Sequence, residues 1–167
     1  LGAKDYYLNN DAATVAIREA YKTYLSKMFQ LYGFSADEAA KKASAVFLHE
    51  TTLATFSKSR TELRDPQANY NKMTLAEFKE NYPNIPLEAL ANAEGIKSEY
   101  LKEMIVGQPA FFAGYDKVAA AECAGTLKAL MEWDIIKSSA SYLSDEIREA
   151  RFEFFGKTMS GRKEDYP

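Results

Sequence analysis

The sequence predicts a mainly α-helical fold, a multi-helix bundle of orthogonal and antiparallel helices with long connecting loops. Apolar residues recur at three- and four-residue steps over most of the chain, which is the helical period. Helix-capping patterns open several of these stretches, and turn-forming residues separate them. A chain of 167 residues, 47% of them hydrophobic, can bury one sizeable core. We therefore expect residues 1–167 to form a single helical domain.

The first long helix is predicted over about residues 11–32. Asn10 or Asp11 can cap its start, because a short polar side chain there accepts a hydrogen bond from a free backbone amide. Gly33 can end the helix, since glycine adopts the left-handed conformation without a steric cost. Its apolar stripe consists of Tyr21, Tyr24, Leu25, Met28, Phe29 and Tyr32.

Capping boxes start the second predicted helix and a later short one. Ser35 and Glu38 have the spacing at which each side chain satisfies a backbone amide of the first turn. The short link before Ser35 predicts antiparallel packing on the first helix. Residues 59–73 then interrupt the helical period with turn-forming residues. Thr74 and Glu77 repeat the capping-box spacing and open a short helix.

The second half of the chain continues the helical pattern. Pro86 suits the first position of a helix that reaches about residue 93, and Pro109 opens another. Residues 100–106, between these two helices, have the composition of an extended segment. A last helix is predicted over about residues 145–158.

The helix predicted over residues 126–143 is apolar on nearly every side. Such a helix is typical of the buried centre of a domain, so we expect it to be covered all round. Its apolar residues are Leu127, Leu130, Met131, Trp133, Ile135, Ile136 and Leu143.

No complete catalytic or metal-binding pattern occurs, so we predict no catalytic residue and no metal ligand in this chain. His49 and Glu50 match the start of a zinc-binding His-Glu-x-x-His helix, but Leu53 stands at the second histidine position and the chain has one histidine. Cys123, the one cysteine, is predicted to be a packing residue. A cysteine-dependent enzyme that pairs Cys123 with His49 is the remaining catalytic alternative within the chain.

The composition argues against two classes of partner. The net charge is −3 with both signs interspersed, which provides no basic surface for nucleic acid. No run reaches the roughly 20 apolar residues that a bilayer span requires. We therefore expect no nucleic-acid partner and no membrane span in this chain.

Glu50 is the one site for which the sequence suggests a specific structural interaction. It lies within the apolar stripe of the second helix, where an unpaired carboxylate would cost several kcal/mol. Arg64, in the loop that follows, is the predicted partner of a charge-assisted bond, with Arg148 or Arg151 of the last helix in reserve. The predicted role of this ion pair is architectural.

Six runs of residues resemble the family of neprilysin and endothelin-converting enzyme, zinc metallopeptidases, and its bacterial endopeptidase members in particular. They occur in family order and span nearly the whole chain. The runs are DYYL (5–8), SRTELRDP (59–66), YNKMTL (70–75), VGQPAFF (106–112), SYLS (141–144) and FEFFGKTMSG (152–161).

The resemblance implies that residues 1–167 are part of the non-catalytic N-terminal helical region of a larger, extracytoplasmic zinc metalloendopeptidase. In that family a helical domain faces a zinc-binding catalytic domain across an enclosed chamber that admits peptides of limited size. The partners implied are the protein's own C-terminal catalytic domain, beyond residue 167, and peptide substrates. Zinc is implied in the parent enzyme and not in this segment, and no substrate-binding residue can be assigned.

Two functions therefore follow from the sequence. The first is a helical lid that supplies one wall of the peptidase chamber. The alternative is a free-standing helical binding module without enzymatic activity. A His-Glu-x-x-His motif in the coding sequence downstream would distinguish the lid from the module.

Overall fold

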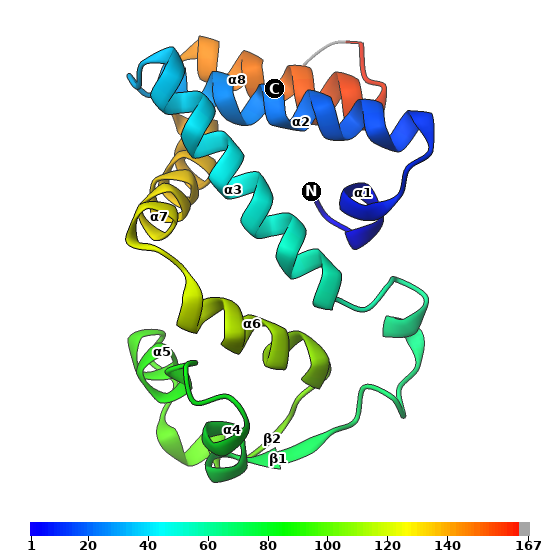
Figure 1. Ribbon diagram of the computed structural model, residues 1–167, viewed down its shortest axis with the longest axis vertical. Coiled ribbons are helices and arrows are strands. Elements are labelled where there is room, and N and C mark those ends of the chain that lie inside the picture. Colours follow the sequence, from blue (N-terminus) through cyan, green and yellow to red (C-terminus); the bar gives the residue numbers. More distant parts are fainter. Residues whose placement is uncertain (164–167) are drawn as a thin grey trace. The chain divides into compact units, whose positions relative to one another are not determined.

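The computed structural model describes residues 1–163 and confirms the mainly α-helical fold (Figure 1). Its α-helices are α1 (Lys4–Leu8), α2 (Ala12–Leu31), α3 (Ala36–Phe56), α4 (Leu75–Asn81), α5 (Leu87–Ala93), α6 (Pro109–Ala121), α7 (Ala124–Ser139) and α8 (Asp145–Arg151). The strands are β1 (Lys72–Thr74) and β2 (Glu103–Ile105). Short 3-10 turns cover Glu62–Arg64, Ser98–Leu101 and Ala140–Tyr142, and α8 continues into a π-helical segment, η4 (Phe152–Thr158).

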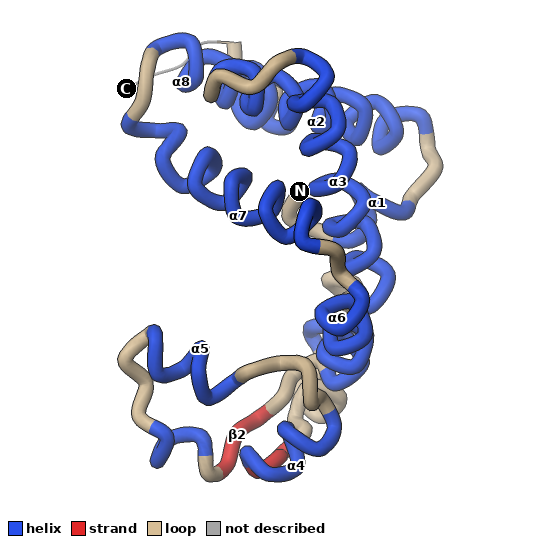
Figure 2. The backbone as a smooth tube through the Cα atoms, turned by 60° about the vertical axis from the view of Figure 1, so that its left-hand side comes forward, coloured by secondary structure: helices blue, strands red, loops and turns tan. Residues whose placement is uncertain are grey.

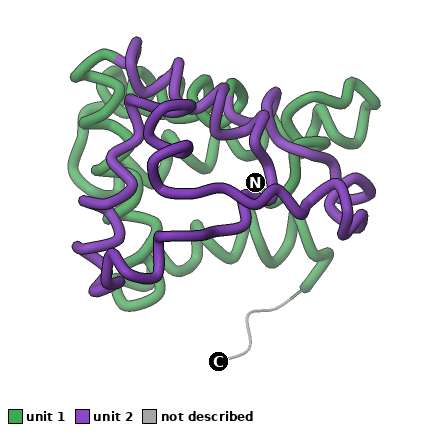
Figure 3. The backbone as a smooth tube through the Cα atoms, turned by 90° about the horizontal axis from the view of Figure 1, so that it is seen from below, with its two compact units in different colours: residues 1–52, 123–167 green, residues 53–122 purple. Residues whose placement is uncertain are grey.

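The chain divides into two compact units, coloured separately in Figure 3. Unit 1 combines Leu1–Thr52 with the chain from Cys123 onward, and unit 2 is Leu53–Glu122. One boundary falls within α3 and the other between α6 and α7. That residues 1–167 act as one domain of a larger peptidase stays a prediction.

Unit 1 is built on α2, with α8 and η4 packed along it. Leu25, Met28 and Phe29 of α2 are fully buried, as the helical stripe predicts. Aromatic contacts extend this core. The Tyr24 ring stacks on Phe154 of η4 at 5.2 Å between centroids and meets Trp133 of α7 edge-on at 5.9 Å. The C-terminal segment is thus held to α2 by ring packing.

The predicted helix caps of α2 and α3 are confirmed. Asp11 accepts a hydrogen bond from the Thr14 backbone amide at 3.0 Å, and Gly33 has a φ of 100° just after α2. The Ser35 hydroxyl accepts from the Glu38 amide at 3.3 Å while the Glu38 carboxylate accepts from the Ser35 amide at 3.2 Å. These local bonds fix where both long helices of unit 1 begin.

Unit 2 packs short helices around a two-stranded antiparallel sheet, drawn in red in Figure 2. Lys72 pairs with Ile105, and the predicted capping box of Thr74 and Glu77 then turns the chain into α4. The core of this unit comprises Phe78, Tyr82, Ile85 and Val106, with Met73, Leu87, Met104, Phe112 and Tyr115 packed against it.

A buried carboxylate also anchors unit 2. Asp116 of α6 accepts hydrogen bonds from the Asn84 backbone amide at 2.7 Å and from the Asn84 side-chain amide at 3.0 Å. It thereby ties α6 to the turn between α4 and α5. This contact is not predictable from the sequence, because nothing in the helical period of α6 distinguishes Asp116 from a surface acid.

The prediction that the helix over residues 126–143 is covered all round is wrong. Ala129, Trp133 and Ile136 of α7 are buried, but Leu127, Met131 and Ile135 lie exposed on the opposite face. The described residues of unit 1 pack against the side of the helix that carries Ala129, Trp133 and Ile136. The helix also ends earlier, at Ser139, and Leu143 lies beyond it and is exposed.

Three further details differ from the prediction. Pro86 is the N-cap of α5 rather than its first residue, whereas Pro109 does open α6. Of residues 100–106, only Glu103–Ile105 form a strand, because a 3-10 turn occupies Ser98–Leu101. The last helix covers the predicted range, but its second half has π-helical hydrogen bonding.

Candidate functional site

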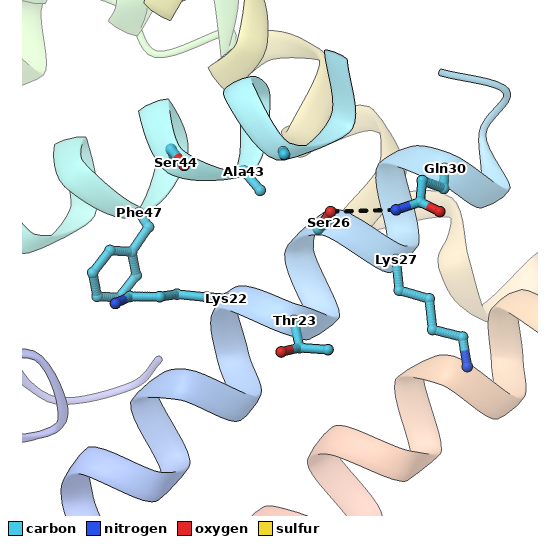
Figure 4. Close-up of a pocket in the computed structure, with 9 residues that line it drawn as sticks. Lys22, Thr23, Ser26, Lys27, Gln30, Ala43, Ser44 and Phe47 are labelled. Carbon is cyan, nitrogen blue, oxygen red and sulfur yellow. Dashed lines mark hydrogen bonds between the residues drawn. The ribbon is translucent and has the colours of Figure 1, made fainter. Parts of the chain in front are cut away.

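A groove of about 590 Å³ lies between α2 and α3, entirely within unit 1 (Figure 4). Its volume falls in the range of about 300–1,000 Å³ that is usual for ligand sites. The capping box of Ser35 and Glu38 and the turn at Gly33 position its two walls, because they lie where the chain passes from α2 to α3. The residues that line it are Lys22, Thr23, Ser26, Lys27, Gln30, Ala40, Ala43, Ser44 and Phe47.

The two walls of the groove differ in chemistry. On the α2 side the residues are polar, and the Gln30 side-chain amide donates to the Ser26 hydroxyl at 3.4 Å. On the α3 side they are small or aromatic, which leaves room for a ligand backbone. Such a surface suits an extended peptide, which needs both hydrogen-bonding groups and apolar contact.

Two lysines, Lys22 and Lys27, carry the positive charge of the groove, and Lys22 is the one beside Phe47. The Lys22 ammonium lies 4.8 Å from the centre of the Phe47 ring (Figure 4). It also lies 2.8 Å from the Glu19 carboxylate. The salt bridge to Glu19 is exposed and therefore weak, so a carboxylate on a ligand could compete for the ammonium.

Glu50 holds three helices of unit 1 together. Its carboxylate accepts a hydrogen bond from the Tyr7 hydroxyl of α1 at 2.8 Å and from the Tyr21 hydroxyl of α2 at 2.9 Å. Burial, followed by the nearby Glu50 charge, raises the pKa of both tyrosines well above the ordinary value. Glu50 is half-buried on α3, and its chemistry is that of a structural acceptor.

The predicted ion pair of Glu50 with Arg64 stays a prediction, since the two residues belong to different units. Of the reserve partners, Arg148 forms a salt bridge with Asp145 at 3.2 Å, and Arg151 lies 5.7 Å from the centre of the Phe155 ring. The apolar stripe of α2 predicts Tyr21 as a core residue, but it does not predict the hydrogen bond of the Tyr21 hydroxyl. Two features of the sequence could have suggested these hydrogen bonds. Glu50 is an acidic residue within an apolar stripe, and Tyr7 and Tyr21 are tyrosines in two other helices.

Cys123 is exposed, so the prediction that it is a packing residue is wrong. It stands at the N-cap of α7, in the turn after α6, where its side chain reaches solvent. Its sulfur lies 3.3 Å from the Thr126 hydroxyl. His49 is half-buried on α3, next to Glu50.

The described part of the chain, residues 1–163, has neither a cluster that could hold a metal ion nor a helix that could span a membrane. Within that range no three His, Cys, Asp or Glu side chains are grouped so that they could hold a metal ion. Nor does any helix in this part of the chain have the length and hydropathy needed to cross a bilayer.

The fold is similar to solved structures of a bacterial peptidase. The zinc metalloprotease Zmp1 of Mycobacterium tuberculosis matches the whole chain with 26% identity and a TM-score of 0.93, both in its open state and in complex with an inhibitor. The match covers 26% of the first of those chains and 25% of the second.

Curated relatives agree with this match. Endothelin-converting enzyme-like 1 of Rattus norvegicus and of Mus musculus is 25% identical over 166 residues. The alignment covers 96% of this chain but 21% of each relative, so the chain spans about a fifth of their length.

The family assignment rests on the whole chain. The N-terminal model of peptidase family M13 matches residues 1–167, a range that includes all six sequence runs. The resemblance to zinc metallopeptidases is therefore confirmed, and the chain belongs to peptidase family M13.

Proposed function

We propose that this chain is the non-catalytic helical lid of a zinc metalloendopeptidase and forms one wall of an enclosed peptide chamber. The observation that carries the proposal is the match of residues 1–167 to the N-terminal family model, together with a fold shared with about a quarter of a zinc metalloprotease. In this proposal the zinc, the catalytic residues and an extracytoplasmic location belong to the parent protein. The chain contributes shape and contacts.

The groove between α2 and α3 is the surface through which this wall would contact a peptide. Its small α3 residues leave space for an extended backbone, and Ser26 and Gln30 offer hydrogen bonds. Lys22 would favour peptides that carry a carboxylate near the groove. This role concerns affinity and selection, and the chemical step takes place elsewhere in the parent.

The test uses the complete parent enzyme and two peptides that differ only in one acidic residue outside the cleaved bond. Lys22→Glu should raise KM for the acidic peptide by roughly three- to tenfold, leave kcat unchanged, and affect the neutral peptide little. Lys41→Glu is the matched control, since Lys41 is exposed on α3 and does not line the groove.

The outcomes separate the two parts of the proposal. Hydrolysis that a zinc chelator abolishes supports the peptidase assignment. Equal effects of Lys22→Glu and Lys41→Glu on both peptides would remove the groove from the account. A parent without any peptide hydrolysis would favour the binding module instead.

A further inference from the structure

A second groove lies against α2, between this helix and the segment that runs from α8 into η4. Its volume is about 390 Å³, and it lies entirely within unit 1. Thr23 and Lys27 line both this groove and the groove between α2 and α3, so the two grooves meet along α2. The residues that line the second groove, named here the α2–η4 groove, are Ala20, Thr23, Tyr24, Lys27, Ala150, Glu153, Phe154 and Thr158.

The buried part of the α2–η4 groove is apolar. The rings of Tyr24 and Phe154 stack with their centres 5.2 Å apart, and both side chains are buried. Ala20 of α2 and Ala150 of α8 have short side chains, which leave the groove open. An apolar surface with a few polar groups that fix orientation is the usual composition of a ligand site.

Two polar groups of the α2–η4 groove have no partner within residues 1–163. The Lys27 ammonium forms no salt bridge there, and the Tyr24 hydroxyl forms no hydrogen bond. Every buried side-chain nitrogen or oxygen in this range has a hydrogen-bond partner, so solvent reaches the Tyr24 hydroxyl even though Tyr24 is 5% exposed. The acidic residue of the groove, Glu153, forms a salt bridge with Lys157 and is therefore already paired.

The two unpartnered groups are placed to act together on one anion. Tyr24 and Lys27 stand three residues apart and so lie on the same side of α2. Burial raises the pKa of Tyr24, and the charge of Arg151 acts in the opposite direction, so a second cation is within electrostatic reach of the hydroxyl. An ammonium and a hydroxyl both donate to carboxylate oxygens, so this arrangement suits a carboxylate.

The spacing of two lysines limits which ligands can use both grooves. Lys22 and Lys27 both line the groove between α2 and α3, and they stand five residues apart, about 7.5 Å along the helix axis. Alternate side chains of an extended peptide point the same way and stand about 6.6–6.8 Å apart. A peptide that follows α2 therefore offers one carboxylate to each lysine when its acidic residues are two positions apart.

We infer that Lys27 and Tyr24 form a second carboxylate subsite, and that this wall favours peptides with two acidic residues separated by one other residue. The inference rests on the proposed function, in which the groove between α2 and α3 contacts peptides. One acidic side chain binds Lys22. The other binds the Lys27 ammonium and the Tyr24 hydroxyl, and its aliphatic part lies in the α2–η4 groove.

Equilibrium binding to the complete parent protein tests this subsite without catalysis. Three fluorescent peptides share one sequence except for a central Glu-Ala-Glu, Glu-Glu-Ala or Glu-Ala-Gln, and a zinc chelator prevents their hydrolysis. Fluorescence anisotropy gives Kd for each. We expect Glu-Ala-Glu to bind roughly two- to fivefold more tightly than either of the others, the gain of one exposed ion pair. Glu-Glu-Ala carries the same charge, so it controls for attraction that does not depend on spacing.

Three variants of the parent assign the preference to the subsite. Lys27→Met should abolish the preference for Glu-Ala-Glu, and Tyr24→Phe, which keeps the ring, should reduce it. Lys41→Met removes the same charge from an exposed position of α3 that lines neither groove, and it should leave the preference unchanged. Equal affinities of the unsubstituted protein for Glu-Ala-Glu and Glu-Glu-Ala would overturn the inference. Equal effects of Lys27→Met and Lys41→Met would also overturn it.

Hydrolysis measured on the same preparation without the chelator tests the proposed function separately. Hydrolysis without a preference for Glu-Ala-Glu would overturn only the second subsite. A preference for Glu-Ala-Glu without hydrolysis would overturn only the peptidase assignment.

Discussion

At the scale of single residues, Glu50 is the residue that links three helices of unit 1 by hydrogen bonds. It accepts hydrogen bonds from Tyr7 and Tyr21 and so joins three helices. Glu50→Ala would leave both hydroxyls without this acceptor, and we expect the free energy of unfolding of unit 1 to fall by about 2–3 kcal/mol. Trp133 fluorescence in urea measures this, because the chain has one tryptophan and it is buried in unit 1.

Two further variants accompany Glu50→Ala. Glu50→Gln keeps an acceptor oxygen and should lose less stability than the alanine variant. Glu149→Ala, at an exposed position of α8, should have a free energy of unfolding within about 0.5 kcal/mol of that of the unsubstituted chain. Identical urea midpoints for Glu50→Ala and Glu149→Ala would show that the tyrosine contacts contribute nothing.

Tyr24 makes the stability of unit 1 sensitive to alkaline pH. Burial raises its pKa to about 12, against about 10 in an unfolded chain. Above pH 10 the unfolded chain releases a proton that the folded chain keeps, so stability falls as pH rises toward 12, by at most about 1.4 kcal/mol per pH unit. Tyr24→Phe should make this decline shallower, as measured by urea unfolding from pH 7 to 12. Superimposable pH profiles would contradict the role assigned to its burial.

Asp116 is the corresponding anchor of unit 2. Asp116→Ala would leave the backbone and side-chain amides of Asn84 unpaired, at a cost of about 2–3 kcal/mol. Hydrogen exchange of the α6 amides, followed by mass spectrometry, should accelerate in this variant and change little in Glu80→Ala, an exposed control in the same unit. Equal exchange rates in the two variants would mean that the turn does not depend on Asp116.

At the scale of elements, the π-helical segment η4 depends on a glycine. A Cβ atom at Gly156 would lie 2.2 Å from the Phe152 ring, so Gly156→Ala should force the ring out of place and cost about 1–3 kcal/mol. The matched variant is Gly125→Ala in α7, where the nearest atom to a new Cβ is the Cys123 sulfur at 3.9 Å. This second change should be neutral or stabilise by up to about 1 kcal/mol. Trp133 fluorescence reports both, and an equal loss in the two variants would contradict the steric argument.

Local signals predicted the elements well, since they depend on residues a few positions apart. The capping boxes at Ser35 and Thr74 and the turn at Gly33 stand where the sequence placed them. Contacts between elements were harder to predict. Periodicity shows that α7 has apolar residues all round, but it cannot show which of them the other helices of unit 1 bury.

The candidate site shows the same difference between local features, which the sequence predicts, and contacts between elements, which it does not. The apolar stripe containing Glu50 indicated that this carboxylate needs a partner, but a hydroxyl from α1, 43 residues away, is not visible in a helical pattern. The groove between α2 and α3 arises from how the two helices diverge, which the short link alone does not determine. The family resemblance, by contrast, depended on the residues themselves and was confirmed over the whole chain.

At the scale of the whole molecule, the account requires a chamber of which this chain is one wall. The chain spans about a quarter of the solved metalloprotease that it matches, and in the proposed function the complete parent would enclose the chamber. A lid restricts access by size, because a folded protein cannot enter a space enclosed by two domains. If this chain encloses the site, cleavage should therefore depend on the length of the substrate and on whether the substrate is folded. If the chain does not enclose the site, neither property should matter.

The most direct measurement compares two substrates of the complete parent enzyme that share one cleavage sequence. One is a short free peptide, and the other carries the same sequence in an exposed loop of a stable folded protein. The account predicts chelator-sensitive hydrolysis of the peptide and no detectable cleavage of the folded protein. Comparable kcat/KM values for the two substrates would contradict the claim that this chain encloses the site.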